Sequence, residues 1–197
     1  MSRDGNGGPY RSAAKLEETL AERRARFESL TSPHIEALYR TALRMTGRQD
    51  RAEDVVQDTY LRAWKYFGTF EQGRDPKVWL FAILRNAVFE ASRLRKRQLG
   101  SASLDEIGAD RVESASESPL EKLTDQDVLA AIDRLPEEFR MVVLLAVVEE
   151  MKYREIAEAL AIPIGTVMSR LFRGRKLLRH HLRSYLEGKG RAETDAD

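Results

Sequence analysis

The chain has 197 residues and carries 33 Lys and Arg against 32 Asp and Glu, so its formal net charge is +1. It has no cysteine and three histidines, which excludes a disulfide framework and a thiolate zinc site and leaves little for an imidazole metal site. No apolar run approaches the roughly 20 residues that a membrane-spanning helix needs, and the first residues lack the apolar stretch of a signal peptide. We therefore expect a cytoplasmic protein without membrane contact, metal or cofactor.

Residues 1–32 predict a flexible N-terminal arm. The segment begins with a glycine-rich tail and continues as a charged stretch, compatible with a helix, through Leu16, Leu20 and Phe27. These residues do not define a fold. We therefore expect the arm to lie outside the folded domains and assign it no role.

Residues 33–98 predict a helical domain, because apolar residues recur at intervals of three and four. The first helix ends at Gly47 and the second at Gly68. Pro76 suits the first turn of the third helix, and Asp75 directly before it is a good N-cap. The residues expected on the buried faces are Ile35, Leu38, Tyr39, Ala42 and Met45, then Val56, Tyr60, Ala63, Trp64 and Phe67, then Val78, Leu80, Phe81, Leu84, Val88 and Ala91.

Residues 99–122 predict a flexible acidic linker between two domains. The stretch contains six Asp and Glu against two basic residues and is rich in Gly and Ser. Its few apolar residues cannot bury enough surface to offset the entropy cost of ordering the segment. Basic clusters lie on both sides of it, at Arg93–Arg97 and from Gly165 to Arg183.

Residues 123–187 predict a second helical domain, and residues 188–197 a tail. One helix is stopped by Pro136, and the next has apolar residues at helical spacing from Phe139 to Ala146. No segment alternates apolar and polar residues between hairpin turns, so we expect no sheet. The expected fold class is all-α, with two small helical domains joined by the linker.

A helix-turn-helix is the most specific local pattern in the sequence. Its first helix is predicted over residues 153–160, its turn contains Pro163, and its second helix begins at Gly165. The inward-facing residues should be Tyr153, Ile156, Ala157 and Leu160 in the first helix and Val167, Leu171, Gly174, Leu178 and Leu182 in the second.

The outward face of the second helix is basic and suits the major groove of DNA. Arginine can bind guanine through two hydrogen bonds or grip a phosphate, and serine can do either more weakly. An antiparallel helical hairpin with a solvated basic face is the alternative interpretation. Phe172 could contact a thymine methyl group or pack on the flank. The residues predicted to contact DNA are Thr166, Ser169, Arg170, Phe172, Arg173 and Lys176.

Aromatic residues lie among cations in the second half of the first domain. Single-stranded DNA requires this combination, because bases stack on rings while phosphates are neutralised. Most aromatic residues at helical spacing belong to a core, and we place Trp64, Phe67 and Trp79 there. The loop Gly68–Pro76 is instead polar and flanked by aromatic rings. The sequence contains no nucleotide-binding, metalloprotease or calcium-loop motif, so we do not expect an enzyme.

Four segments of the chain resemble the extracytoplasmic-function (ECF) sigma factors of bacterial RNA polymerase. Residues 52–64, which read AEDVVQDTYLRAW, and residues 79–86 resemble the second conserved region of that family. Residues 135–144 and 162–179 resemble its fourth region, while the third region of larger sigma factors is absent. The resemblance implies a transcription initiation factor that binds core polymerase and selects promoters, in a stress or envelope response.

The resemblance also implies functional residues. Asp54, Gln57 and Asp58 share one helix face, which in the family binds the clamp coiled coil of the beta-prime subunit. The loop Gly68–Pro76 corresponds to the place where the family captures a base flipped out of the minus-ten element. The helix-turn-helix would bind the minus-thirty-five element. The residues expected to bind minus-ten DNA are Lys77, Arg85, Asn86, Arg93, Arg95, Lys96 and Arg97.

The implied partners are core RNA polymerase, through its beta-prime and beta subunits, promoter DNA and an anti-sigma factor. An acidic linker that folds back on Arg93–Arg97 or Arg170–Lys176 would be a rival means of inhibition. The alternative function is a stand-alone helix-turn-helix transcriptional regulator whose helical N-terminal domain dimerises or binds a ligand. Tight operator binding by a free dimer would favour that alternative, whereas weak duplex binding without polymerase favours a sigma factor.

Overall fold

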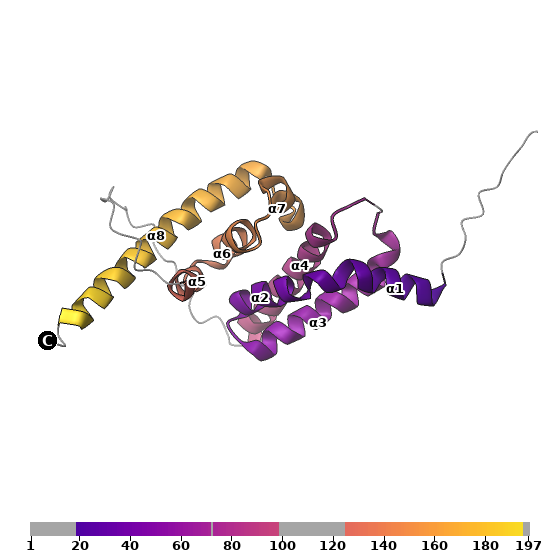
Figure 1. The fold of residues 1–197 in the computed structure, drawn as a ribbon, viewed down its shortest axis with the longest axis horizontal. Coiled ribbons are helices and arrows are strands. Elements are labelled where there is room, and N and C mark those ends of the chain that lie inside the picture. Colours follow the sequence, from indigo (N-terminus) through magenta and orange to yellow (C-terminus); the bar gives the residue numbers. More distant parts are fainter. Residues whose placement is uncertain (1–18, 72, 99–124, 195–197) are drawn as a thin grey trace, which may run out of the picture.

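The protein's structure, a computed structural model, describes residues 19–71, 73–98 and 125–194, with the backbone alone for Gln98, Asp125 and residues 184–194. Every element in these ranges is helical, as predicted. Figure 1 shows two groups of helices, which we call the N-terminal half (α1–α4) and the C-terminal half (α5–α8). The predicted linker and the glycine-rich start of the predicted arm lie outside the described residues.

The N-terminal half begins with a helix inside the segment predicted as an arm. Thr19 caps α1, since its hydroxyl accepts a hydrogen bond from the Glu22 N–H at 3.2 Å and its own N–H donates to the Glu22 carboxylate at 2.8 Å. This capping box satisfies two backbone donors and starts the helix. From Leu20 onward, the structure therefore differs from the prediction of an arm outside the fold. The helices of this half are α1 (Leu20–Thr31), α2 (Ile35–Thr46), α3 (Gln49–Tyr66) and α4 (Pro76–Gln98).

Two predicted helix boundaries are confirmed. α2 ends at Gly47, whose φ of 70° is left-handed and whose N–H donates to the Leu43 carbonyl at 2.8 Å, a common way to end a helix. α4 begins at Pro76, and the Lys77 N–H donates to the Asp75 carboxylate at 2.7 Å. Gly47 thus fixes where α2 stops, and Pro76 fixes where α4 starts.

α3 buries a different stripe from the one predicted. Tyr60 and Trp64 are only half-buried, although Phe27 of α1 covers this flank. The Phe27 ring meets Tyr60, Trp64 and Phe67 edge-on, with ring centroids 6.2, 5.2 and 5.1 Å apart, an arrangement that aromatic pairs favour. α1 thus completes this side of the domain. The fully buried residues of α3 are Ala52, Val55, Thr59 and Ala63.

Polar groups close the seam between α1 and α3. The Tyr60 hydroxyl donates to the Thr31 carbonyl at 2.8 Å, and burial raises the pKa of Tyr60 to about 12. The Arg23 guanidinium lies 4.9 Å from the centroid of the Trp64 ring and donates to the Trp64 carbonyl at 3.3 Å. Arg26 lies over the Phe67 ring at 4.4 Å. These cation–π contacts add to the ring packing that holds α1 in place.

The C-terminal half contains the predicted helix-turn-helix. The inward face of its second helix is confirmed, because Val167 and Leu171 are fully buried. Tyr153 differs from its prediction, since 37% of its surface is exposed while Ala159 faces the core. The helices of this half are α5 (Asp125–Asp133), α6 (Glu137–Val143) with a π-helical turn at Leu144–Val148, α7 (Tyr153–Leu160) and α8 (Ile164–Thr194).

The close approach of α8 to α6 depends on Gly174. A Cβ atom at this position would lie 2.8 Å from Val143 Cγ2 and 3.5 Å from Phe139 Cβ. Carbon atoms that are not bonded prefer separations of about 3.5–4.0 Å. The missing side chain is therefore what lets the two helices pack at their present distance.

The two halves share a contiguous core. α4 packs against α7 and α2 packs against α6, and Figure 1 shows α7 beside α4. The buried apolar side chains form one cluster that includes residues of both halves. We call this arrangement, in which the C-terminal half packs on α2 and α4, closed.

Candidate polymerase and nucleic-acid interface

The face of α3 that the resemblance assigns to polymerase is open to solvent. Asp54 and Gln57 are exposed, and the Asp58 carboxylate forms an ion pair with Arg62 at 2.8 Å. Leu61 lies on the same face, with 63% of its surface exposed. It is absent from the predicted set, although the spacing of 54, 57, 58 and 61 places it on one helix face. This face therefore combines carboxylates, an amide and a large apolar side chain.

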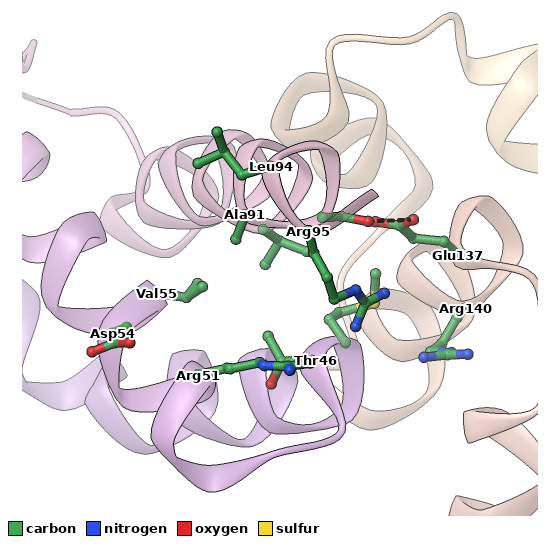
Figure 2. Close-up of a pocket in the computed structure, with 12 residues that line it drawn as sticks. Thr46, Arg51, Asp54, Val55, Ala91, Leu94, Arg95, Glu137 and Arg140 are labelled. Carbon is green, nitrogen blue, oxygen red and sulfur yellow. Dashed lines mark hydrogen bonds between the residues drawn. The ribbon is translucent and has the colours of Figure 1, made fainter. Parts of the chain in front are cut away.

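A hollow of about 360 Å³ lies beside this face, between α2, α3, α4 and α6. Figure 2 shows Arg51 and Arg95 reaching into it from α3 and α4, with Asp54 at its edge. Arg140 lines the α6 side and donates to the Leu135 carbonyl at 2.8 Å. Burial lowers the pKa of Arg140. The hollow thus places cations next to the exposed Asp54.

The seven residues predicted to bind minus-ten DNA lie on α4 but do not share one face. Asn86, Arg93 and Arg97 form an exposed stripe that lines a shallow depression with Phe89. Arg95 reaches into the hollow. The remaining residues of the set, which contact the C-terminal half, are Lys77, Arg85 and Lys96.

Lys77 and Arg85 differ most from the expectation that these cations face DNA. The Lys77 ammonium donates to the Glu149 carbonyl at 2.6 Å. The Arg85 guanidinium donates to the Leu160 carbonyl at the end of α7. Both groups are half-buried, because the C-terminal half covers this part of α4. In the closed arrangement Lys77 and Arg85 are withdrawn from the DNA face of α4, whereas the cations from Arg93 to Arg97 stay exposed.

Aromatic rings pack together next to the loop that follows α3. Phe67 is buried, as predicted, and stacks on Phe70 with ring centroids 6.1 Å apart. Phe70 in turn contacts Trp79 at 4.8 Å. Gly73 has φ of 94°, a conformation that glycine adopts without strain. Tyr66 has 51% of its surface exposed at the same end of α3, with the Lys65 ammonium 5.4 Å from the centroid of its ring, so an exposed ring lies next to a packed cluster of rings.

Three residues predicted to contact DNA from the helix-turn-helix are exposed on the outward face of α8. They are Ser169, Arg173 and Lys176. Arg170 differs from its prediction, because its guanidinium lies 3.3 Å from the Glu138 carboxylate on α6. This ion pair braces α8 against the rest of the C-terminal half. The half-buried members of the predicted set are Thr166 and Arg170.

Phe172 lies beside the row of Ser169, Arg173 and Lys176 on α8, one helical turn from Ser169 and from Lys176. It is 68% exposed and lines a groove with Met168 and Tyr153. Met168 and Phe172 are four residues apart, a spacing that sequence reading alone can detect.

None of the helices in the described ranges is both long enough and apolar enough to cross a membrane. In the same ranges, no three His, Asp or Glu side chains are grouped as metal ligands would be. Among the described residues, exposed carboxylates lie on α3, exposed cations on α4 and α8, and the exposed ring of Tyr66 at the end of α3.

Comparisons with known proteins agree with this arrangement. Residues 30–98 match sigma-70 region 2, and residues 125–178 match sigma-70 region 4. The ECF RNA polymerase sigma factor SigL of Mycobacterium tuberculosis is 32% identical over 169 residues, which cover 84% of this chain and 94% of SigL. The chain belongs to the ECF sigma factors. SigE of Mycolicibacterium smegmatis is 34% identical over 160 residues, 79% of this chain and 61% of SigE.

The N-terminal half of this ECF sigma factor is thus its region 2 and the C-terminal half its region 4, while most of α1 precedes the matched part of region 2. A solved relative is the sigma factor RpoE of Bartonella quintana, in complex with the anti-sigma factor NepR. It has a TM-score of 0.65 and 31% identity, and the match covers 80% of this chain and 97% of that chain. Membership in this family decides against a stand-alone regulator, because sigma factors direct RNA polymerase to promoters. Sigma factors are also not enzymes.

Proposed function

We propose that this ECF sigma factor works in the cytoplasm, docks on core RNA polymerase through α3 and contacts promoter DNA at two elements. The acidic face of α3, with Leu61 among its carboxylates, contacts the beta-prime subunit. α4 and the loop before it bind the minus-ten element, and α8 reads the minus-thirty-five element. The observation that carries this proposal is the exposed row of Ser169, Arg173 and Lys176 on the second helix of a helix-turn-helix within a region 4 match.

Arg173→Ala should remove base discrimination worth about 1–3 kcal/mol at one position of the minus-thirty-five element, because an exposed arginine can bind guanine through two hydrogen bonds. Ser169→Ala should cause a smaller loss of the same kind. The measurement is binding of the holoenzyme to promoter duplexes that differ by single base pairs. Lys176→Ala is the control, since loss of a phosphate contact weakens binding to all duplexes and reduces the salt slope by about 1. Equal losses on every duplex for all three variants would contradict these roles.

Asp54→Ala combined with Leu61→Ala should weaken binding to core polymerase roughly tenfold or more, which corresponds to about 1.4 kcal/mol. The pair removes a charge and an apolar contact from one exposed face. Asp58 stays unchanged in this variant because its carboxylate also holds Arg62. The measurement is competition between variant and parent for a limiting amount of core polymerase.

Glu53→Ala is the matched control for this face. Glu53 is an exposed carboxylate of α3 that accepts a hydrogen bond from Gln49 at 3.0 Å and lies about 100° around the helix from Asp54, at the margin of the proposed face. It should compete for core as well as the parent does. If the double variant also competes as well as the parent, with unchanged helical content, the docking face lies elsewhere.

An anti-sigma factor is the further partner in this proposal. The supporting observation is that RpoE of Bartonella quintana, 31% identical to this chain, is solved in complex with the anti-sigma factor NepR. A tagged form of this chain purified from its native host should bring down a protein that suppresses run-off transcription with core polymerase. Repeated recovery of the chain alone, fully active in that assay, would contradict this part. A stress or envelope response is tested separately by comparing transcripts with and without the factor.

A further inference from the structure

Acidic residues of the C-terminal half pair with cations of the N-terminal half at several points of the contact between the two. They come from the α5–α6 segment, the loop before α7 and α7 itself. The N–O distances lie between 2.5 and 3.7 Å. The pairs are Arg40–Glu149, Lys77–Glu149, Arg44–Asp133, Arg74–Glu158 and Lys96–Glu137.

Glu149 is the most buried member of this set. Its side chain is 2% exposed and accepts two hydrogen bonds from the Arg40 guanidinium, at 2.9 and 3.2 Å. The Thr41 hydroxyl donates to the same oxygen at 3.4 Å, and the Lys77 ammonium lies 3.5 Å from the other oxygen. All three partners belong to the N-terminal half. A carboxylate of the C-terminal half is therefore inserted between α2 and α4.

This insertion makes the contact between the halves sensitive to one charge. A buried carboxylate is tolerated only when it is paired and hydrogen-bonded, and removing its partners leaves a large desolvation cost. Glu149 follows the π-helical turn, outside the regular helices of the C-terminal half. If the halves separated, its carboxylate would regain water without any change within either half.

The same contact occupies cations that the proposed function assigns to DNA. The Lys77 ammonium contacts both the backbone carbonyl and the carboxylate of Glu149. The Arg85 guanidinium donates to the Leu160 carbonyl. Lys96 lies 3.7 Å from Glu137. By contrast, Ser169 and Arg173 on α8 remain exposed. The closed arrangement therefore covers part of the minus-ten face but leaves the minus-thirty-five face free.

We infer that the isolated sigma factor is held closed by an acidic clasp, centred on Glu149, in which region 4 occupies the DNA-binding cations of region 2. Opening of the clasp is then a required step before minus-ten DNA can bind. The inference rests on the proposed role of α4 in minus-ten binding. It differs from inhibition by the acidic linker, because the carboxylates of the clasp belong to the folded part of region 4.

Distance measurements between the halves test the clasp directly. The chain has no cysteine, so Glu36→Cys on α2 and His180→Cys on α8, both at exposed positions, carry a donor and an acceptor dye. In this labelled background, Glu149→Lys places a cation between Arg40 and Lys77 and should lower energy transfer. Glu150→Lys is the matched control, because it makes the same charge change at the exposed neighbouring position and should leave energy transfer unchanged.

Binding of single-stranded DNA tests the inhibitory role. The probe is the non-template minus-ten strand of a promoter that the holoenzyme transcribes. Since apparent affinity scales with the fraction of protein in the competent state, Glu149→Lys should bind this strand roughly tenfold more tightly than the parent. Glu150→Lys should gain about twofold at most, from the added charge alone. Binding to minus-thirty-five duplexes should be the same for both variants, which also shows that region 4 remains folded.

A reciprocal variant keeps the test decisive. Adding Arg40→Glu to Glu149→Lys recreates one ion pair of reversed polarity, while Lys77 still faces the new lysine, and should restore part of the energy transfer and lower single-strand affinity again. Unchanged energy transfer in Glu149→Lys would overturn the clasp, and opening without a gain in affinity would overturn its inhibitory role. Adding Lys77→Ala to Glu149→Lys separates the clasp from the proposed role of Lys77 in minus-ten binding. If the gain in single-strand affinity persists without Lys77, the clasp stands and the minus-ten role of Lys77 fails.

Discussion

Phe67→Ala should lower the free energy of unfolding by about 3–5 kcal/mol, the usual cost of emptying a buried aromatic position. The side chain is 1% exposed. Its ring contacts Phe27, Trp64, Phe70 and Trp79, with centroid distances between 5.1 and 6.4 Å. The substitution would leave these rings around a cavity that the helices cannot close without moving α1. Urea unfolding followed by circular dichroism measures the loss.

Tyr66→Ala is the control for Phe67→Ala. Tyr66 is the preceding residue, also aromatic, but 51% of its surface is exposed. Its replacement should change stability by only about 0.5 kcal/mol, as surface substitutions usually do. If the two variants unfold at the same urea concentration, the ring cluster is not the stabilising centre of the N-terminal half.

Gly174→Val should destabilise the C-terminal half by about 1–3 kcal/mol, the range expected for overpacking a core. The new side chain would begin with a Cβ atom 2.8 Å from Val143 Cγ2, so α8 must move away from α6. Because α8 carries Ser169 and Arg173, the same displacement should weaken binding to minus-thirty-five duplexes. Thermal unfolding and duplex binding measure the two effects.

Gly165→Val provides the comparison on the same helix. A Cβ atom at Gly165 meets no other atom within 4 Å. Since valine has a slightly better helix propensity than glycine, this variant should be as stable as the parent. A stability loss equal to that of Gly174→Val would show that the β-branched side chain, and not the contact with α6, causes the effect.

Helix positions in this protein could be predicted because local sequence determines them. Gly47 and Pro76 mark helix ends through their backbone preferences alone, which do not depend on the rest of the fold. The inward stripe of α8 follows from apolar spacing, since Val167 and Leu171 are apolar, lie four residues apart and are both buried. The exposed row of Ser169 and Arg173 follows from the same periodicity.

The contacts between elements could not be predicted in this way. α1 has little apolar spacing, and its packing depends on Phe27 and on Arg23 and Arg26 placed over rings of another helix. Glu149 reads as an ordinary surface acid, because its partners are more than 70 residues away in the chain. Arg170 has the spacing of a DNA contact, yet a carboxylate from α6 binds it. Such pairings depend on how the helices pack against one another, and the periodicity of a single helix carries no information about that packing.

The packing of α1 bears on how region 2 can be prepared as a separate fragment. The sigma-70 region 2 match starts at residue 30, and a fragment cut there would lose Phe27 while keeping the rings of Tyr60, Trp64 and Phe67 that it covers. A contiguous apolar patch exposed in this way promotes aggregation. A fragment that begins at or before Thr19 retains both the cover and the capping box of α1. The solubility of region 2 in isolation thus depends on a helix most of which precedes the region 2 match.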